Sequence, residues 1–553
     1  MTTAAAPPTP AAGPDGGRLT VPARVRRWLY PLVVAVILGQ MAVAMVTSAV
    51  QQTPTIDEPV YVATAVWQVQ EHSLRYNPEH PPLGKLLIGA GLAFSGAEID
   101  PAFQGDQTAL GRHLLYESGY DPWRLMLLAR LPVIVLTLLF GLVVFAFARD
   151  VAGPVGGLVA LALYAFSPDV VAHGSLATLD VPTVGLLLTS VWLAWRARQR
   201  PRLYVPLAAL ALGAGLATKM SALPLVPVLL LLVILSVWSA GGRSWRAAAW
   251  GAGAAAGAAM IAVAVVWASY LAVDPRLGWV PPAGVPDSGG LRGLVAGLLP
   301  FPEAYRDGMR IQFGFEDGRW SGYLFGEVFT GGRWYYLPAA LLVKSPLGAM
   351  VLWLAGAVTL LAVPRLRAAA PYLLVPSAVL LAVAMTGTRS FGTRYALVVP
   401  VFLAVAAAAV VAVRWRWARV GAGLLVLFVA VSSLRTFPYY LPYSNEAFGG
   451  PARTHEHLHD SNVDWGQDLG RLADRLRDRY AGQRTWLVYK GSGVPSWYGI
   501  EASDPLAVPA GEVRGLLVVS DSSVAKATGP LAELIRTSEP IDSVGHSITI
   551  FRR

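Results

Sequence analysis

A short acidic motif in the chain has the composition of a general base. The run Thr55-Ile56-Asp57-Glu58-Pro59 directly follows a long apolar segment. Two adjacent carboxylates at a membrane surface are costly unless they are solvated, paired or functional. An ionised Asp57 could take a proton from an acceptor hydroxyl during a group transfer. Asp57 could equally cap a helix that carries Pro59 in its first turn, so both roles stay open at this point.

Several cations lie at positions where membrane proteins seldom place them. Positive side chains normally concentrate on the cytoplasmic side. Five cations are predicted at the opposite ends of the apolar segments: Lys85, Lys219, Lys344, Arg389 and Arg394. Such cations need an anionic partner, and a lipid-linked phosphate whose charge grows during transfer is a natural one. The alternative is that each cation pairs with a carboxylate such as Asp57 or Asp180.

The elements that must position these residues are membrane helices. The chain of 553 residues is 55% hydrophobic and only 14% charged, whereas soluble domains carry about a quarter charged residues. Its apolar runs approach the roughly 20 residues that cross the hydrocarbon core, where only a helix satisfies the backbone. We predict an all-α polytopic membrane protein with about 11 transmembrane helices, at 29–50, 125–148, 152–170, 176–196, 203–218, 221–240, 247–272, 335–362, 370–386, 395–413 and 418–437.

The orientation follows from arginine clusters in the short loops, which all fall on one side if the number of spans is odd. The positive-inside rule makes that side cytoplasmic. Residues 1–28, rich in Ala, Pro and Gly, are predicted to be a disordered cytoplasmic tail, and 29–437 the transmembrane domain. Loops 51–124 and 273–334 then face outside, as does 438–553, which we predict to form a small α/β C-terminal domain.

The order of the motifs resembles the protein O-mannosyltransferase family. Asp57-Glu58 matches the acidic motif of that family, and a helix with tyrosine and tryptophan separates it from His80-Pro81-Pro82-Leu83-Gly84-Lys85, which matches the second motif. Asp180 lies where the family has another acidic motif, and the turn before Lys219 is similar to its glycine-lysine turn. The layout also resembles bacterial transferases that move aminoarabinose onto lipid A. Both groups belong to the GT-C class of membrane glycosyltransferases.

The resemblance implies transfer of a sugar, mannose or another hexose, from a polyprenyl-phosphate carrier to an acceptor hydroxyl, with inversion. Asp57 would be the base, with Glu58 and Asp180 orienting it or the acceptor. The donor phosphate would contact Lys85, Lys219, Lys344, Arg389 and Arg394. Further substrate contacts would come from Tyr61, His80, Arg130 and His173. Because phosphate is already a good leaving group, the reaction would need neither a metal nor another cofactor.

The acceptor stays open between a protein and a glycan. Eukaryotic protein O-mannosyltransferases carry a large inserted lumenal domain, and the loop 273–334 is too short to hold one. An alternative within the same class is transfer of arabinofuranose or aminoarabinose to a glycan or glycolipid. Outside the enzymes, the alternatives are a lipid or sugar transporter or flippase and a scaffold protein. A transporter often has an internal repeat, and none is evident in this sequence.

The C-terminal segment opens with an unusual polar string. His455, His457 and His459 alternate and invite a zinc site, but alternate residues share a face only on a strand. Proline, glycine and asparagine crowd this stretch, so we predict no metal. An equally open interpretation is a loop over the active site that contacts sugar hydroxyls, with contacts from Asp460, Asn462, Asp464 and Trp465. The string is similar to one in bacterial members of the wider family.

The amino-acid composition limits which partners the protein can bind and which cellular compartment it can occupy. The sequence has no cysteine, which excludes disulfides and thiolate chemistry. A net charge of +10 could suggest nucleic acid, but the arginines lie between apolar runs and form no basic face. The expected partners are membrane lipid, the lipid-linked donor and the acceptor. The abundance of Ala, Gly, Arg and Val is typical of a GC-rich bacterial genome, which predicts a bacterial plasma membrane.

Overall fold

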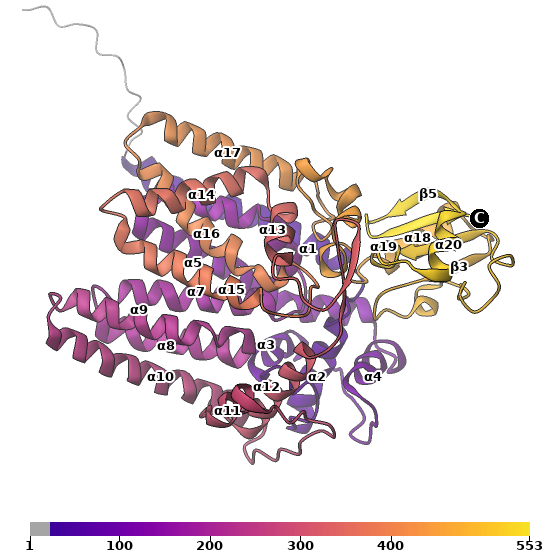
Figure 1. Cartoon of the computed structure of the whole chain (residues 1–553), viewed down its shortest axis with the longest axis horizontal. Helices are drawn as coiled ribbons and strands as arrows, with labels where there is room; N and C mark the ends of the chain where they lie inside the picture. Colours follow the sequence, from indigo (N-terminus) through magenta and orange to yellow (C-terminus); the bar gives the residue numbers. More distant parts are fainter. Residues whose placement is uncertain (1–22) are drawn as a thin grey trace, which may run out of the picture.

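A computed structural model describes residues 23–553, so most of the predicted tail 1–28 lies outside the described residues. Long apolar helices lie side by side in a bundle, and the C-terminal α/β region lies at one end of it (Figure 1). The helices of the bundle are α1 (Ala23–Gln51), α5 (Pro122–Ala165), α6 (Pro168–Gly174), α7 (Asp180–Arg196), α8 (Pro201–Thr218), α9 (Leu225–Ala240), α10 (Trp245–Val273), α13 (Tyr336–Lys344), α14 (Leu347–Ala362), α15 (Ala370–Ala384), α16 (Val398–Ala407) and α17 (Arg416–Leu434).

The number of candidate membrane spans is smaller than predicted. Within residues 23–553, six helices are long and apolar enough to cross a membrane, or up to seven if α13 and α14 count as one bent span. A helix lies in every predicted segment, but the count of eleven is not confirmed. Segments 125–148 and 152–170 are joined in the 44-residue helix α5, which is kinked at Gly153 (φ 79°). Helices α7 and α9, with 17 and 16 residues, are short for a full crossing.

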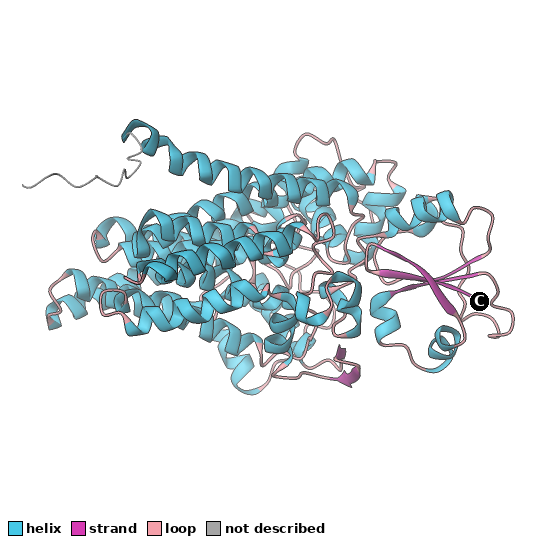
Figure 2. Ribbon diagram, turned by 90° about the horizontal axis from the view of Figure 1, so that it is seen from above, coloured by secondary structure: helices cyan, strands magenta, loops and turns pink. Residues whose placement is uncertain are grey.

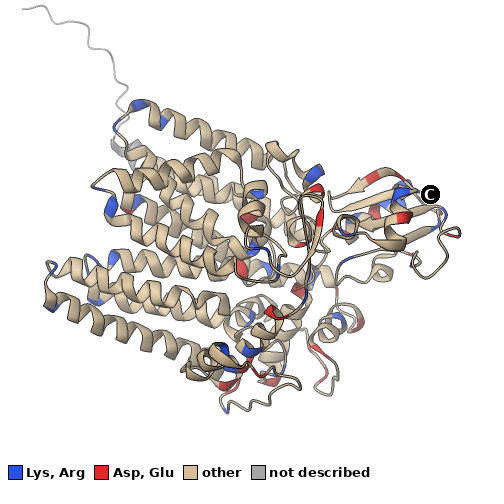
Figure 3. Ribbon diagram, viewed as in Figure 1, with Lys and Arg blue, Asp and Glu red and all other residues tan. Residues whose placement is uncertain are grey.

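Charge is unevenly distributed along the bundle. Lys and Arg gather at the helix ends that lie away from the C-terminal region, whereas both signs of charge mix at the opposite end (Figure 3). The bend of 118° between α13 and α14 lies in the mixed half, where Pro346 cannot continue the hydrogen bonds of α13. The ionisable groups that could carry chemistry therefore collect at the end of the bundle that faces the C-terminal region.

Short elements cover this end of the bundle. The first outer loop forms α2 (Glu58–Glu71), α3 (Pro82–Leu92), α4 (Gln107–Arg112) and the π-helix η1 (His113–Glu117). The second forms α11 (Gly290–Leu298), α12 (Glu303–Glu316) and a hairpin of β1 (Ser321–Leu324) and β2 (Glu327–Thr330). Figure 1 shows α2 and α4 at this end of the bundle, and α11 and α12 beside the same end of α10.

The C-terminal region is a small α/β unit, as predicted. Its four strands are β3 (Thr485–Val488), β4 (Leu516–Ser520), β5 (Glu539–Val544) and β6 (Ile548–Arg552). They are ordered β3-β4-β6-β5, and β3 and β4 are parallel while the other pairs are antiparallel. Apolar side chains from both faces of this sheet pack against the helices α18 (Leu469–Arg479) and α20 (Gly529–Arg536), which Figure 2 shows around it. A short helix, α19 (Asp521–Ala525), follows β4.

Backbone hydrogen bonds attach the C-terminal segment to the first outer loop. The amide of Thr53 donates to the carbonyl of Gln467 over 3.0 Å, and the amide of Ile56 donates to the carbonyl of Trp465 over 3.0 Å. The hydroxyl of Ser492 donates to the carbonyl of Thr55 over 2.9 Å. These bonds fix Thr53, Thr55 and Ile56, just before Asp57, although more than 400 residues separate the two segments.

Candidate active site

Asp57 directly precedes α2, at the N-cap position, but its side chain does not cap the helix. Within residues 23–553, no backbone amide of the first helical turn donates to its carboxylate. Instead, Oδ2 of Asp57 lies 2.6 Å from Nη1 of Arg394, which opens the segment before α16. The Asp57 side chain is 27% exposed, against 8% for Arg394. Because the Asp57 carboxylate is accessible and the Arg394 guanidinium beside it is buried, a substrate can contact the carboxylate directly.

A second ion pair lies close to the first. Lys219, at the end of α8, places Nζ 2.5 Å from Oδ1 of Asp180 at the start of α7, and both side chains are largely buried. The ring of Tyr395 lies close to both cations, with its centre 5.7 Å from Nζ of Lys219 and 4.9 Å from the Arg394 guanidinium. The structure therefore brings together four charges from separate segments, Asp57, Asp180, Lys219 and Arg394, which we call the charge cluster.

Trp465 covers the charge cluster from the C-terminal side. The Arg394 guanidinium lies 4.4 Å from the centre of the Trp465 ring, within the range of a cation–π contact. The ring of His173 lies 5.9 Å from Trp465 in an edge-on arrangement. His173 is fully buried, and neither ring nitrogen has a hydrogen-bond partner within the described part of the chain. Both residues thus lie beside the cluster.

His80 lies among the predicted cations. Burial holds the pKa of its imidazole well below its ordinary value, and the charges of Lys219, Lys85, Arg389 and Arg394 lower it further. The ring is therefore neutral at physiological pH, and its Nδ1 has no hydrogen-bond partner within residues 23–553. Tyr61 of α2 contacts it edge-on, with ring centres 5.7 Å apart. A neutral imidazole in this place can exchange a hydrogen bond with a sugar hydroxyl or a phosphate.

Lys85 binds backbone carbonyls of the loop that precedes it. This arrangement differs from the predicted direct contact of Lys85 with the donor phosphate. Its Nζ donates to the carbonyls of Asn77 and His80, each over 2.7 Å, and to Oδ1 of Asn77 over 3.3 Å. These acceptors use all three ammonium hydrogens. Burial also lowers the pKa of Lys85 to about 7. The His-Pro-Pro turn thus keeps its shape because a buried lysine ties its carbonyls together.

Two other predicted phosphate ligands also have protein partners. Lys344 is buried, with Nζ 2.5 Å from the carbonyl of Leu441, 2.9 Å from that of Asn462 and 3.4 Å from the carboxylate of Asp169. Arg389 lies 2.7 Å from Glu316 of α12 and remains about one-fifth exposed. The alternative in which cations pair with carboxylates therefore applies in this structure to Lys219, Lys344, Arg389 and Arg394.

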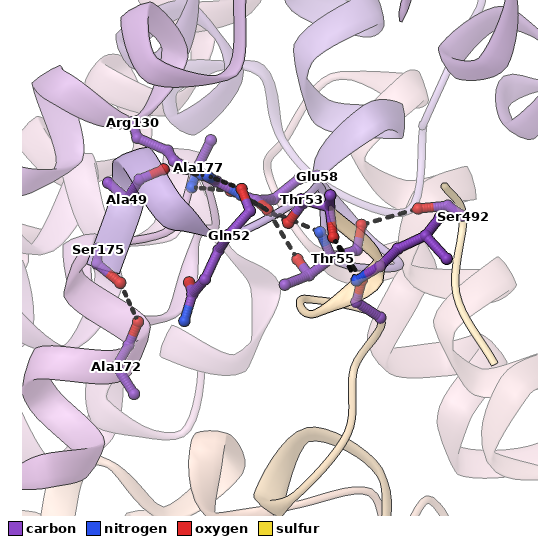
Figure 4. A network of polar contacts seen from close by, with 12 residues as sticks. Ala49, Gln52, Thr53, Thr55, Glu58, Arg130, Ala172, Ser175, Ala177 and Ser492 are labelled. Carbon is purple, nitrogen blue, oxygen red and sulfur yellow. Dashed lines mark hydrogen bonds and ion pairs between the residues drawn. The ribbon is translucent and has the colours of Figure 1, made fainter. Parts of the chain in front are cut away.

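Arg130 and Glu58 form a closed network rather than a substrate contact (Figure 4). The two side chains are fully buried and make two parallel bonds of 2.8 and 2.7 Å. Arg130 also donates to the carbonyls of Ala49, Gln52 and Thr53. Glu58 accepts from the amide of Ala177 over 2.7 Å. No donor of Arg130 is left for a sugar, so the network joins α1, α2, α5 and the turn before α7.

The polar residues of the C-terminal string have mixed environments. Asp460 pairs with Lys490 over 2.5 Å. Asn462 accepts from the amide of Thr393 and donates to Tyr336, which fixes the backbone next to Arg394. Asp464 is buried, and its Oδ2 has no partner within the described residues. These three side chains position the loop, and only Trp465 of the predicted four touches the charge cluster.

An open groove of about 390 Å³ lies beside the acidic motif. Ile56, Pro59 and Val60 form one wall, Arg112 of α4 lies along it, and the loop around Ser492 forms the other wall. Its lining residues lie on both sides of Asp57 in the sequence, so the groove gives solvent access to this part of the first outer loop.

Sequence reasoning missed Glu316, Tyr395 and Lys490. Tyr395 was adjacent to a predicted residue, but its contact with two cations depends on the packing of α7, α8 and η4 (Thr393–Ala396). Glu316 ends an amphipathic helix, a signal that indicates a solvated face as readily as a site. Within residues 23–553, no group of three or more His, Asp or Glu side chains is arranged to hold a metal ion.

Comparison with known proteins gives one family match. Residues 125–268 match the family described as dolichyl-phosphate-mannose-protein mannosyltransferase. The match confirms the resemblance to protein O-mannosyltransferases over this segment, which contains Asp180 and Lys219. The motifs at Asp57 and His80 lie outside it. No curated protein matches the chain.

Solved structures with similar folds include three membrane glycosyltransferases. ArnT from Cupriavidus metallidurans bound to undecaprenyl phosphate is 14% identical with a TM-score of 0.47, and the match covers 96% of this chain and 98% of that one. The Archaeoglobus fulgidus oligosaccharyltransferase is 12% identical with a TM-score of 0.41, over 93% and 72% of the two chains. The Saccharomyces cerevisiae Pmt1–Pmt2 protein O-mannosyltransferase complex is 20% identical with a TM-score of 0.35, over 48% and 38%. All three TM-scores are below 0.5, and no conclusion about activity follows from them.

Proposed function

We propose that this chain is a GT-C glycosyltransferase that moves a sugar from a polyprenyl-phosphate carrier to an acceptor hydroxyl. The family match over residues 125–268 supports the class. The single observation that carries the proposal is the charge cluster, in which Asp57–Arg394 and Asp180–Lys219 meet around Tyr395. Such a site offers both a carboxylate for a hydroxyl proton and cations for a phosphate.

Donor binding would exchange partners within the charge cluster. Arg394 would turn from Asp57 to the donor phosphate, and Lys219 would share its charge between Asp180 and the same phosphate. Asp57 would then be free to accept the proton of the acceptor hydroxyl. The exchange costs less than breaking a buried pair outright, because each cation keeps an anionic neighbour throughout.

The chemical step is a displacement at the anomeric carbon. The acceptor oxygen attacks that carbon as Asp57 takes its proton, and the bond to the phosphate oxygen breaks with inversion. Negative charge grows on the leaving polyprenyl phosphate, and Arg394 and Lys219 stabilise it more strongly than in the ground state. Glu58 acts indirectly, because its bonds to Arg130 and Ala177 fix the start of α2.

The proposed donor sugar is mannose or another hexose, and arabinofuranose or aminoarabinose is the alternative. The acceptor, a protein or a glycan, would approach through the groove of about 390 Å³ that Ile56 and Pro59, the neighbours of the Asp57-Glu58 pair, help to line. We propose a multi-pass protein of a bacterial plasma membrane, with a cytoplasmic N-terminus and an extracytoplasmic C-terminal region. The basic helix ends opposite the site support this orientation (Figure 3).

The test is incubation of purified protein with a panel of polyprenyl-phosphate sugars, followed by mass spectrometry of the released carrier. We expect one donor to be consumed in the presence of a hydroxyl acceptor. Asp57→Asn should lower turnover by about 10² to 10⁴-fold, the usual contribution of a general base, and should retain donor binding because Arg394 remains.

The matched control is Asp100→Asn, which changes an exposed carboxylate of the same outer loop. It should transfer like the unmodified protein. Full turnover by Asp57→Asn would remove the assignment of the base. Consumption of no donor in the panel, with movement of a lipid-linked sugar across vesicles instead, would favour a flippase.

A further inference from the structure

Helix α11 carries a complete apolar face that points outward. Leu291, Leu294, Val295 and Leu298 are 75%, 58%, 42% and 73% exposed. Their spacing of three and four residues places them on one side of the helix. Isolated exposed leucines are ordinary, but four on one face of a nine-residue helix form a continuous patch that calls for a partner.

The opposite side of α11 is packed on the protein. Ala296 is fully buried, and α11 contacts α12. Arg292, between the two faces, lies 2.7 Å from Asp317 beyond the end of α12. The helix is thus held by its small and charged residues, whereas its large apolar residues face away from the rest of the described chain.

The apolar face continues the lipid-facing surface of α10. The loop that follows α11 is tied to α10, because Nε1 of Trp267 donates to the carbonyl of Pro300 over 2.9 Å. Met260 and Leu271 of α10 are 69% and 42% exposed, as expected of a span that faces lipid. Tryptophan near the end of a span is typical of the membrane–water interface. Figure 1 shows α11 beside this end of α10.

We propose that α11 is a membrane-surface helix whose partner is the lipid of the leaflet on the side of the charge cluster. Its leucines would enter the boundary between head groups and acyl chains, as the apolar face of an interfacial helix does. The proposal holds whichever sugar the protein transfers, and even if it transfers none.

Anchoring α11 would also position part of the candidate site. Helix α12, which follows it, ends at Glu316, and this carboxylate pairs with Arg389. The side chain of Gln312 donates to the carbonyl of Glu79 in the His-Pro-Pro loop over 3.0 Å. A helix fixed at the lipid surface therefore sets the depth at which two outer loops meet.

The test uses the absence of cysteine from the sequence. Single-cysteine variants Leu291→Cys, Leu294→Cys and Leu298→Cys of the full chain are labelled with bimane and placed in phosphatidylethanolamine–phosphatidylglycerol vesicles. Leu506→Cys, 50% exposed in the C-terminal region, is the water control, and Leu424→Cys, 62% exposed on α17, is the lipid control. Quenching is measured with aqueous iodide and with lipids that carry a nitroxide near the head group or deep in the acyl chain.

We expect the three α11 labels to be quenched by the shallow nitroxide and to show several-fold weaker iodide quenching than the label at position 506. Iodide quenching equal to that at 506 would overturn the proposal. Protection from both quenchers would also overturn it, because it would mean that protein, such as a second copy, covers the face. Hydrogen exchange of residues 290–298 in the unmodified protein, slower in bilayers than in a short-chain detergent, provides a readout free of substitutions.

Discussion

Every cation of the proposed donor site already has a partner in this structure, which changes what each residue can do. Lys85 and Lys344 are tied to backbone carbonyls in the interior, so they shape loops. Arg394 and Lys219 pair with carboxylates that the reaction itself would use. The charges of the site therefore cancel until a phosphate enters, which limits the cost of keeping them at membrane depth.

Arg394 should not be replaceable by lysine. Its planar guanidinium contacts Asp57, Tyr395 and the face of Trp465 at once, which an ammonium cannot reproduce. We expect Arg394→Lys to lower kcat/KM by at least about tenfold, equivalent to about 1.4 kcal/mol. Steady-state transfer kinetics measure the effect. Arg333→Lys, at an arginine that stacks on Phe329, is the control and should leave the rate unchanged. Equal rates for both variants would contradict the role of Arg394.

Glu58 should matter for stability as well as for transfer. Glu58→Gln leaves the buried guanidinium of Arg130 without its counter-charge, and breaking such a pair costs about 3–5 kcal/mol. We expect the Glu58→Gln protein to unfold at a lower temperature in detergent, and tryptophan fluorescence measures this temperature. Glu98→Gln, at an exposed position of the same loop, should not change it. A stable but inactive Glu58→Gln protein would instead point to a direct catalytic role.

At the scale of elements, the loop 460–468 joins the C-terminal region to the site. Burial raises the pKa of Asp464 to about 7 from an ordinary value of 3.8, with Asp521 raising it further and Lys490 lowering it. Between pH 4 and pH 7, roughly, Asp464 therefore keeps its proton in the folded protein but loses it in the unfolded chain. As the pH rises, ionisation of this buried carboxyl destabilises the folded conformation of the loop, so the stability of the loop depends on pH.

The expected sign is a loss of stability of the loop as the pH rises from about 4 to about 7, because the folded state binds more protons there. Hydrogen exchange of residues 460–468 should be faster at pH 8 than at pH 5.5 after correction for the intrinsic rate. Asp464→Asn should remove that difference, whereas Asp504→Asn, in an exposed loop, should keep it. Exchange in Asp464→Asn that still depends on pH would assign the effect to another group.

At the scale of the whole molecule, the C-terminal region completes the site. It supplies the backbone partners of Thr53 and Ile56 and the ring that covers Arg394. The four-stranded sheet and its helices have cores of their own, whereas residues between 440 and 465 pack in the core of the bundle.

A variant truncated after residue 437 keeps every long apolar helix and should insert into membranes, but it should lose transfer because it lacks the cover of Arg394 and part of the bundle core. Its first outer loop would lack the bonds that fix Asp57, and limited proteolysis should cut near residues 53–57. Full-length Trp465→Ala should keep the loop protected and lose only part of the activity. An active truncated protein would show that the C-terminal region has another role.

The sequence by itself determined the positions of the helices, the polar ends of the spans and the four charged residues that became the charge cluster, but not Tyr395. Hydropathy depends only on residues that are close in the sequence, so each long apolar run predicts a helix without knowledge of the tertiary structure. It did not determine how many helices cross the membrane, because the kink at Gly153 and the bend after Lys344 depend on packing. The short helices α7 and α9 were likewise not distinguishable from full spans by composition.

Only the tertiary structure decided which charges meet. Asp57 and Arg394 are 337 residues apart, and Lys219 and Asp180 are 39 apart. The sequence marked all five cations as equivalent candidates, whereas folding buried Lys85 and Lys344 among carbonyls, placed Arg394 beside the accessible carboxylate of Asp57 and placed Lys219 beside the buried carboxylate of Asp180. The physical reason is that a buried charged group must pair with an opposite charge or a polar group nearby, and the fold brings that partner from a segment far away in the chain.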